Sequence, residues 1–164
     1  MKNKGLKIVG SVLLGAFVLY NIFWLYSVNK IYAPYKKAIG CSIYLSSCMK
    51  QEEGYTYGVN SPSYLSHVGN LFITEEITVE EDGSSNATCD LLIWPLRNGG
   101  YEFGVSILSG TVKGSDNVSV DMMLDENMQL IGSYDEDVVI LYQNSLDKIK
   151  SLYALADEKW EIFE

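Results

Sequence analysis

An uninterrupted apolar stretch near the start of the chain constrains most strongly what this sequence can fold into. It runs from Ile8 to Val28, reads IVGSVLLGAFVLYNIFWLYSV and contains no charged residue among its 21 positions. A helix rises about 1.5 Å per residue, so this stretch would extend over about 31 Å, close to the thickness of a bilayer's hydrocarbon core. We therefore predict a transmembrane helix that binds the lipid bilayer through residues 8–28.

The residues around this stretch indicate a signal anchor rather than a cleaved signal peptide. Cleaved signals have an apolar region of about 7–15 residues followed by a small-x-small site. Here the first plausible small residue beyond the stretch is Ala33, directly before Pro34. Lysines lie on both sides, so the orientation is inferred from the short tail and from cysteines that suit an oxidising compartment. We expect residues 1–7 to be a short cytoplasmic tail and the rest of the chain to lie outside.

Two small residues within the predicted span suggest how helices of two copies would approach each other. Ser11 and Gly15 are four positions apart and therefore share one face of the helix. Small residues at this spacing allow close helix packing in lipid. The sequence thus suggests a weak homodimer through Ser11 and Gly15.

The charge of the chain is segregated. All 21 acidic residues follow Lys50, whereas residues 31–164 contain only eight of the 12 basic residues, which gives that part a net charge of −13. Such a surface repels phosphate backbones, which argues against nucleic acid as a partner. It attracts cationic partners, although acidity also serves simply to keep a tethered domain in solution.

Three cysteines bear on the segment that follows the predicted span. Residues 29–50 form the expected membrane-exit linker, and Cys41 and Cys48 within it are close enough for a disulfide across a short loop. Cys89 would then be left buried, but it could instead pair with either of the others or join two protomers. A zinc site is not expected, because the chain has a single histidine and no CxxC pair.

Residues 51–164 are expected to form one acidic α+β domain. Apolar and polar residues alternate, as in strands, over residues 55–59, 69–81, 101–108 and 118–124, and residues 128–131 would add a last short strand. Residues 87–96 are apolar on both faces, which is typical of a central strand. From Val138 to Ala156 the apolar spacing changes to three and four, which is typical of a helix with one apolar stripe. The predicted fold is an N-terminal transmembrane helix followed by a small antiparallel sheet of four to five strands, packed on one long C-terminal helix.

The sequence contains no convincing arrangement for catalysis or for binding a metal or a cofactor. His67 is the only histidine and has no nucleophile motif beside it. Glu75 and Glu76 are adjacent, so in a strand they point to opposite faces, which argues against their acting together as acid and base in glycoside cleavage. The oxygen ligands of Asp121, Asp125 and Asn127 have even spacing but lack the glycine and the terminal glutamate of a calcium-binding loop. No catalytic, cofactor-binding or metal-binding residue is therefore predicted.

Tyrosines form the remaining candidate site. Tyr55, Tyr57 and Tyr64 fall within one short segment, where exposed rings would bind a protein or a sugar and buried rings would fill the core. Asn86 and Asn117 begin glycosylation sequons that also fit ordinary turns.

Taken together, these features favour a single-pass membrane protein whose outer domain is a non-catalytic module that binds another protein. Two alternatives stay open. One is a small envelope hydrolase that uses carboxylates, and the other is an inhibitor or immunity protein that neutralises a cationic toxin or a lysozyme-like enzyme.

Overall fold

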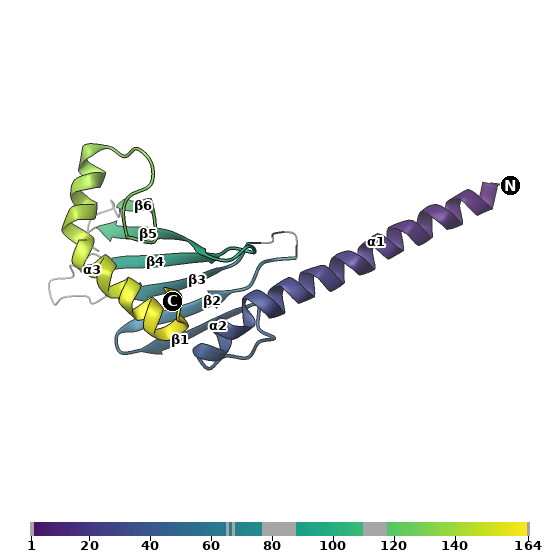
Figure 1. Ribbon diagram of the computed structural model, residues 1–164, viewed down its shortest axis with the longest axis horizontal. Coiled ribbons are helices and arrows are strands. Elements are labelled where there is room, and N and C mark those ends of the chain that lie inside the picture. The colour runs from purple at the N-terminus through teal and green to yellow at the C-terminus, as the bar shows by residue number, and fades with distance from the viewer. Residues whose placement is uncertain (1, 65, 67, 77–87, 110–117, 164) are drawn as a thin grey trace.

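The computed structural model describes residues 2–64, 66, 68–76, 88–109 and 118–163. It confirms the predicted α+β class, with an N-terminal apolar helix, an antiparallel sheet and a long C-terminal helix (Figure 1). The expected four to five strands are wrong, because the sheet has six strands within these described residues. The elements are α1 (Lys2–Ile31), α2 (Ala33–Ala38), β1 (Ser47–Glu52), β2 (Tyr55–Asn60), β3 (Asn70–Glu75), β4 (Thr88–Pro95), β5 (Tyr101–Ser109), β6 (Val118–Leu124) and α3 (Glu136–Trp160).

Helix α1 extends away from the rest of the molecule (Figure 1). The most apolar 18-residue window of its segment Lys7–Ile31 has a mean hydropathy of 2.0, and none of that window is packed inside the protein. By length and composition, this one helix among the described residues is able to cross a membrane. Pro34 lies in the first turn of α2, where its missing N–H is tolerated, and the helical path breaks at Tyr32 just before it.

The six strands form a meander in which every strand pairs antiparallel with its neighbour in sequence. The strand that sequence reasoning missed is β1, which begins within the expected linker and ends at Glu52, two residues beyond it. Its residues are mostly hydrophilic, and it pairs with β2 alone at the edge of the sheet. The predicted strand over residues 128–131 is only an isolated bridge between Leu130 and Leu124.

Helix α3 lies against one face of the sheet, and the core is between them (Figure 1). Alternate residues of the strands point toward it, and three α3 side chains, Ile149, Leu152 and Ala156, are almost fully buried against them. The segment expected as a linker also contributes to the core, through Tyr32 and Ile39.

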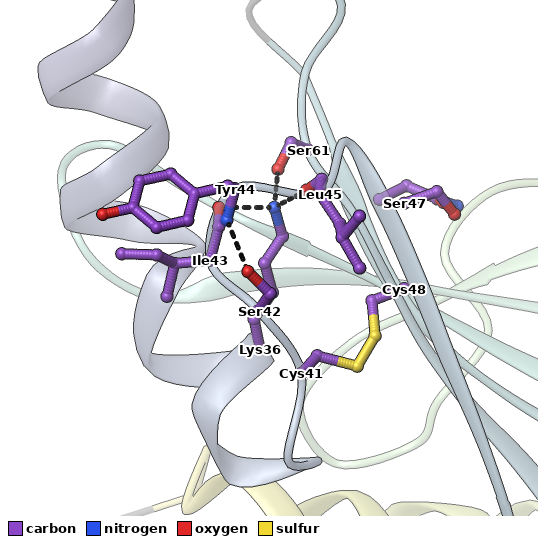
Figure 2. The surroundings of a disulfide bond; sticks show 10 residues. Lys36, Cys41, Ser42, Ile43, Tyr44, Leu45, Ser47, Cys48 and Ser61 are labelled. Carbon is purple, nitrogen blue, oxygen red and sulfur yellow. Dashed lines mark hydrogen bonds between the residues drawn. A yellow bond between two sulfur atoms is a disulfide. The ribbon is translucent and has the colours of Figure 1, made fainter.

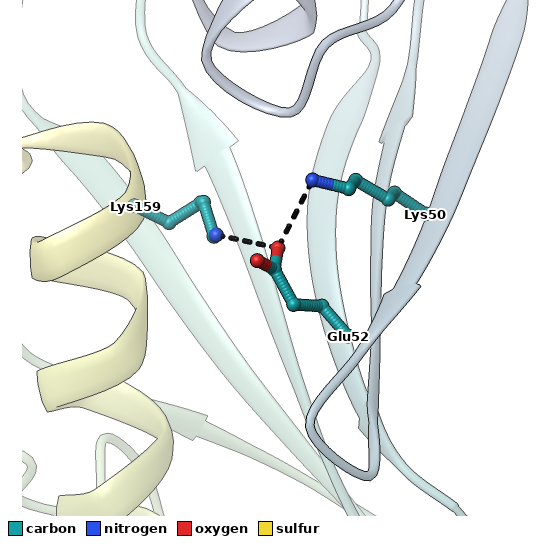
Figure 3. Close-up of polar contacts among 3 residues, drawn as sticks. All are labelled: Lys50, Glu52 and Lys159. Atoms are coloured by element: carbon teal, nitrogen blue, oxygen red, sulfur yellow. Dashed lines mark hydrogen bonds and ion pairs between the residues drawn. The ribbon is translucent and has the colours of Figure 1, made fainter.

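One ion pair joins the end of α3 to the edge strand β1, and a second ion pair within β1 shares the same carboxylate (Figure 3). Glu52 Oε2 lies 2.9 Å from Lys159 Nζ and 3.2 Å from Lys50 Nζ. The hydrogen bonds and charges of these two ammonium groups lower the pKa of Glu52, with the bond from Lys159 contributing most. The pair between Lys159 and Glu52 thus connects the last turn of α3 to the strand that sequence reasoning did not find.

Candidate functional site

The face of the sheet opposite α3 has a row of apolar positions that crosses all six strands. Side chains of neighbouring partners in a sheet point to the same face, so the pairing register defines the row. Met49 and Met123, at its two ends, are 65% and 37% exposed, and Phe72 and Leu92 between them are half-buried. From β1 to β6 the apolar row is Met49, Gly58, Phe72, Leu92, Gly104 and Met123.

The two glycines of the apolar row leave room for aromatic rings. A Cβ atom at Gly58 would lie 2.0 Å from Cζ of Phe72, and one at Gly104 would lie 2.9 Å from the ring of Trp94. Both rings therefore lie directly over the neighbouring strand. Beside the Trp94 ring, a hollow of about 220 Å³ is lined by Leu92, Met123 and other residues of this face. The glycines thus make this part of the sheet a continuous apolar surface.

A polar row runs beside the apolar row, two residues along each strand: Gln51, Thr56, Thr74, Asp90, Ser106 and Asp121. Asp90, at its centre, accepts a hydrogen bond from Thr74, but its Oδ1 atom is buried and has no hydrogen-bond partner among the described residues. Burial raises the pKa of Asp90, and the nearby charge of Glu75 raises it further.

The charges on this face have one sign. Among the described strands, the charged residues on the open face are Asp90, Glu102 and Asp121, all of them acidic. Lys50, the only lysine in those strands, pairs instead with Glu52, the carboxylate that also pairs with Lys159 of α3. The open face therefore combines an apolar row with negative charge.

The three tyrosines proposed from the sequence lie in three different places. Tyr57 is buried under α3, where its ring centre lies 6.2 Å from that of Trp160. Tyr55 is half-buried at the start of β2. Tyr64 is 38% exposed and packs against α1, with its ring centre 5.3 Å from that of Tyr20. They therefore do not form one surface.

Cys41 and Cys48 are joined by a disulfide, with 6.3 Å between their Cα atoms, in the segment between α2 and β1 (Figure 2). Lys36, in α2 beside this segment, is only 1% exposed. Its ammonium donates to the carbonyl oxygens of Ile43 and Leu45 and to Oγ of Ser61. Burial lowers the pKa of Lys36. Because its ammonium N–H groups donate hydrogen bonds to these three acceptors, Lys36 holds the loop between α2 and β1 in place. Its buried amine is not accessible to a substrate.

The remaining candidate groups for catalysis do not lie together in one site. Cys89 is buried and unpaired, and burial raises its pKa to about 12, so the reactive thiolate is disfavoured. Glu75 is paired with Lys148 at 2.8 Å. Asp125 Oδ1 accepts the N–H groups of Asn127 and Gln129.

Metal and sugar sites receive no support from the described residues. No group of three or more His, Cys, Asp or Glu side chains is placed there to hold a metal ion. His67, Asn86 and Asn117 lie outside the part of the chain that the structure describes.

The two adjoining rows are thus the strongest candidate for a functional surface. Sequence reasoning missed them because a row depends on the register of six strands, and no single stretch of sequence contains it. The rows offer contact area and charge, and no arrangement for a covalent step. Comparison with protein-family models, with curated proteins and with solved structures found no match to this chain.

Proposed function

We propose that the protein is a single-pass membrane protein whose domain binds another protein on the open face of the sheet. The observation that carries this proposal is the apolar row, uncovered by α3 and exposed at both ends. Exposed contiguous apolar surface in a protein of this size marks an interaction site, because leaving it in water costs free energy.

The charge of the open face defines the partner. Its carboxylates, Asp90, Glu102 and Asp121, would oppose one another if two copies of this chain met face to face. A partner with apolar side chains ringed by lysine or arginine would fill the apolar row and neutralise the acids. Association with such a partner is steered by charge and slows as salt screens it.

The anchoring half of the proposal rests on α1. Its length, its hydropathy and its extension away from the domain support a bilayer-spanning segment. The Cys41–Cys48 disulfide supports placing the domain in an oxidising compartment outside the membrane. Protease added to sealed cells should then digest the domain, and protection of the domain would contradict this orientation.

Site-specific photocrosslinking tests the proposed surface. A photoreactive phenylalanine analogue replaces Met49 or Met123 in the full-length chain, expressed in its source cells. The control position is Ile140, which is 47% exposed on α3. We expect both ends of the apolar row to give the same heterologous product, which is absent at Ile140. Equal products at Ile140, or a product with twice the mass of the chain, would contradict the proposal.

A pair of charge reversals tests the acidic character of the site. Asp121→Lys should reduce the crosslinked product at Met49 about tenfold, because like charges across an interface cost at least about 1.4 kcal/mol. Asp147→Lys makes the same charge change on α3, where the Asp147 side chain is fully exposed, and should leave the product unchanged. Equal effects of the two reversals would show that binding depends on the net charge of the domain and not on the acidic residues of the open face.

A further inference from the structure

A cavity lies where α1 meets the domain. It has a volume of about 420 Å³ and separates the last turns of α1 from the turn that joins β4 to β5. Phe23, Ile31 and Leu96 provide apolar walls, and Lys30 and Arg97 add two cations. We call this cavity the exit groove.

The domain contacts α1 well before its last residue. The Tyr20 hydroxyl donates to the carbonyl oxygen of Tyr64, and the Trp24 indole N–H donates to that of Ser63 at 3.3 Å. The ring centre of Tyr64 lies 5.3 Å from that of Tyr20 and 5.4 Å from that of Trp24. Ser63 and Tyr64, which follow β2, thus lie along the part of α1 that the apolar sequence places in the membrane.

These contacts determine the depth of the exit groove. If the whole domain stood clear of the bilayer, only residues 8–19 would remain in lipid, and at about 1.5 Å per residue they would extend over only about 18 Å. The hydrocarbon core is about 30 Å thick. The loop at Tyr64 and the turn at Arg97 must therefore enter the bilayer beside α1. The lining of the exit groove continues past Val28 to Lys30 and Pro34, so the groove opens at the level of the headgroups.

The charge of the exit groove is opposite to that of the domain. Arg97 is the only arginine of the chain. Its guanidinium carbon lies 4.8 Å from the ring centre of Phe23, and Lys30 Nζ lies 5.5 Å from that of Tyr26. In the described part of the chain, neither cation forms an ion pair. Both are therefore available to an anion at headgroup depth.

We propose that the exit groove binds one anionic phospholipid. Its phosphate lies between Lys30 and Arg97, where a guanidinium can donate two hydrogen bonds to phosphate oxygens. One of its two acyl chains follows Phe23 and Leu96 into the bilayer. This inference rests on the proposed anchoring through α1, and it adds a lipid that is bound specifically rather than one that merely surrounds the helix.

Lipid retention tests the exit groove. The full-length chain is reconstituted in nanodiscs of equal parts phosphatidylcholine and phosphatidylglycerol, released in mild detergent and weighed by native mass spectrometry. The wild type should retain one phosphatidylglycerol per chain. The Lys30→Gln/Arg97→Gln variant should retain at least about tenfold less, equivalent to about 1.4 kcal/mol of binding free energy. Lys37→Gln removes an exposed charge nearby that does not line the groove, and should behave as the wild type.

Carbonate extraction of membranes separates the two proposals. If wild type and variant both stay in the membrane and retain equal phosphatidylglycerol, the lipid site is wrong while the anchoring stands. Equal retention of phosphatidylcholine by the wild type would likewise overturn the anionic site. Release of the wild type by carbonate would overturn the anchoring and this inference together. Unchanged circular dichroism of the variant shows that its loss of lipid is not a loss of fold.

Discussion

Lys159, near the end of α3, donates a hydrogen bond of 2.9 Å to Glu52 of β1, 107 positions earlier in the chain. This contact joins the last helix to the first strand, and with Lys50 it keeps the pKa of Glu52 below its ordinary value of 4.5. A carboxylate with a lowered pKa stabilises the fold at higher pH, and that stability is lost as the pH falls through the lowered value.

The first prediction concerns this carboxylate. Glu52→Gln should lower the melting temperature slightly at pH 7, and the difference from the wild type should disappear in acid, where the wild-type carboxylate is also neutral. Melting followed by circular dichroism at several pH values measures this. Glu53→Gln, one residue further on, is the matched control. A difference that persists in acid would contradict an electrostatic origin.

The second prediction concerns the ring over Gly58. Gly58→Ala should destabilise the wild type, because the added Cβ displaces the Phe72 ring. In a Phe72→Ala background the same change should stabilise the fold by about 0.5–1 kcal/mol, since alanine is better than glycine within a strand. A double-mutant cycle of urea unfolding should therefore give a coupling of about 1 kcal/mol or more. Additive effects would show that the ring does not depend on the glycine.

The third prediction concerns the buried lysine. Lys36→Met leaves the carbonyl groups of Ile43 and Leu45 without their donor, and should lower the free energy of unfolding by about 1–3 kcal/mol. Lys37→Met is the adjacent control, and its exposed side chain should change stability by less than about 0.5 kcal/mol. Chemical denaturation distinguishes the two. If both variants lowered the free energy of unfolding by the same amount, the structural role assigned to Lys36 would be wrong.

The fourth prediction concerns the disulfide. Peptide mapping without reduction should recover Cys41 linked to Cys48, and Cys89 as a free thiol. Replacing both bonded cysteines by alanine should cost about 2–3 kcal/mol, because the closed loop is short. Reducing agent should destabilise the wild type and leave the double variant unchanged. A crosslink from Cys89 to either residue would contradict this pairing.

The fifth prediction concerns Asp90. Its raised pKa means that the fold favours the protonated form, so the wild type loses stability as the pH rises from 3.8, the ordinary value, through the raised value. Asp90→Asn keeps an acceptor for the Thr74 hydroxyl and does not titrate, so it does not lose stability as the pH rises. Its melting temperature should therefore exceed that of the wild type at pH 7 and match it in strong acid. Asp121→Asn, with an exposed side chain in the same polar row, should show little change at either pH.

The elements with a strong local pattern were predictable from sequence. Alternation over Tyr101–Leu108 predicted β5, which is Tyr101–Ser109 in the structure. The three-and-four spacing of apolar residues predicted α3, although the helix begins before Val138 and continues to Trp160. In both cases one face is buried, so the burial pattern appears in the sequence itself.

Features that depend on distant pairing were not predictable. β1 is an edge strand whose exposed residues lack the usual alternation, and only its pairing with β2 identifies it. The apolar row combines single residues from six strands. The contact between Tyr20 and Tyr64 spans 44 positions and depends on how the domain sits on α1. Each requires tertiary arrangement that no local pattern contains.

The meander determines the order in which the protein can be built. Each strand after β1 pairs with the strand that precedes it in the sequence. The sheet can therefore add strands in order during synthesis, without a distant segment. The side chains that seal the core, Ile149, Leu152 and Ala156, arrive only with α3. If translation stalled before α3, the complete sheet would expose its apolar core face to water. Chaperones and quality-control proteases recognise intermediates of this kind.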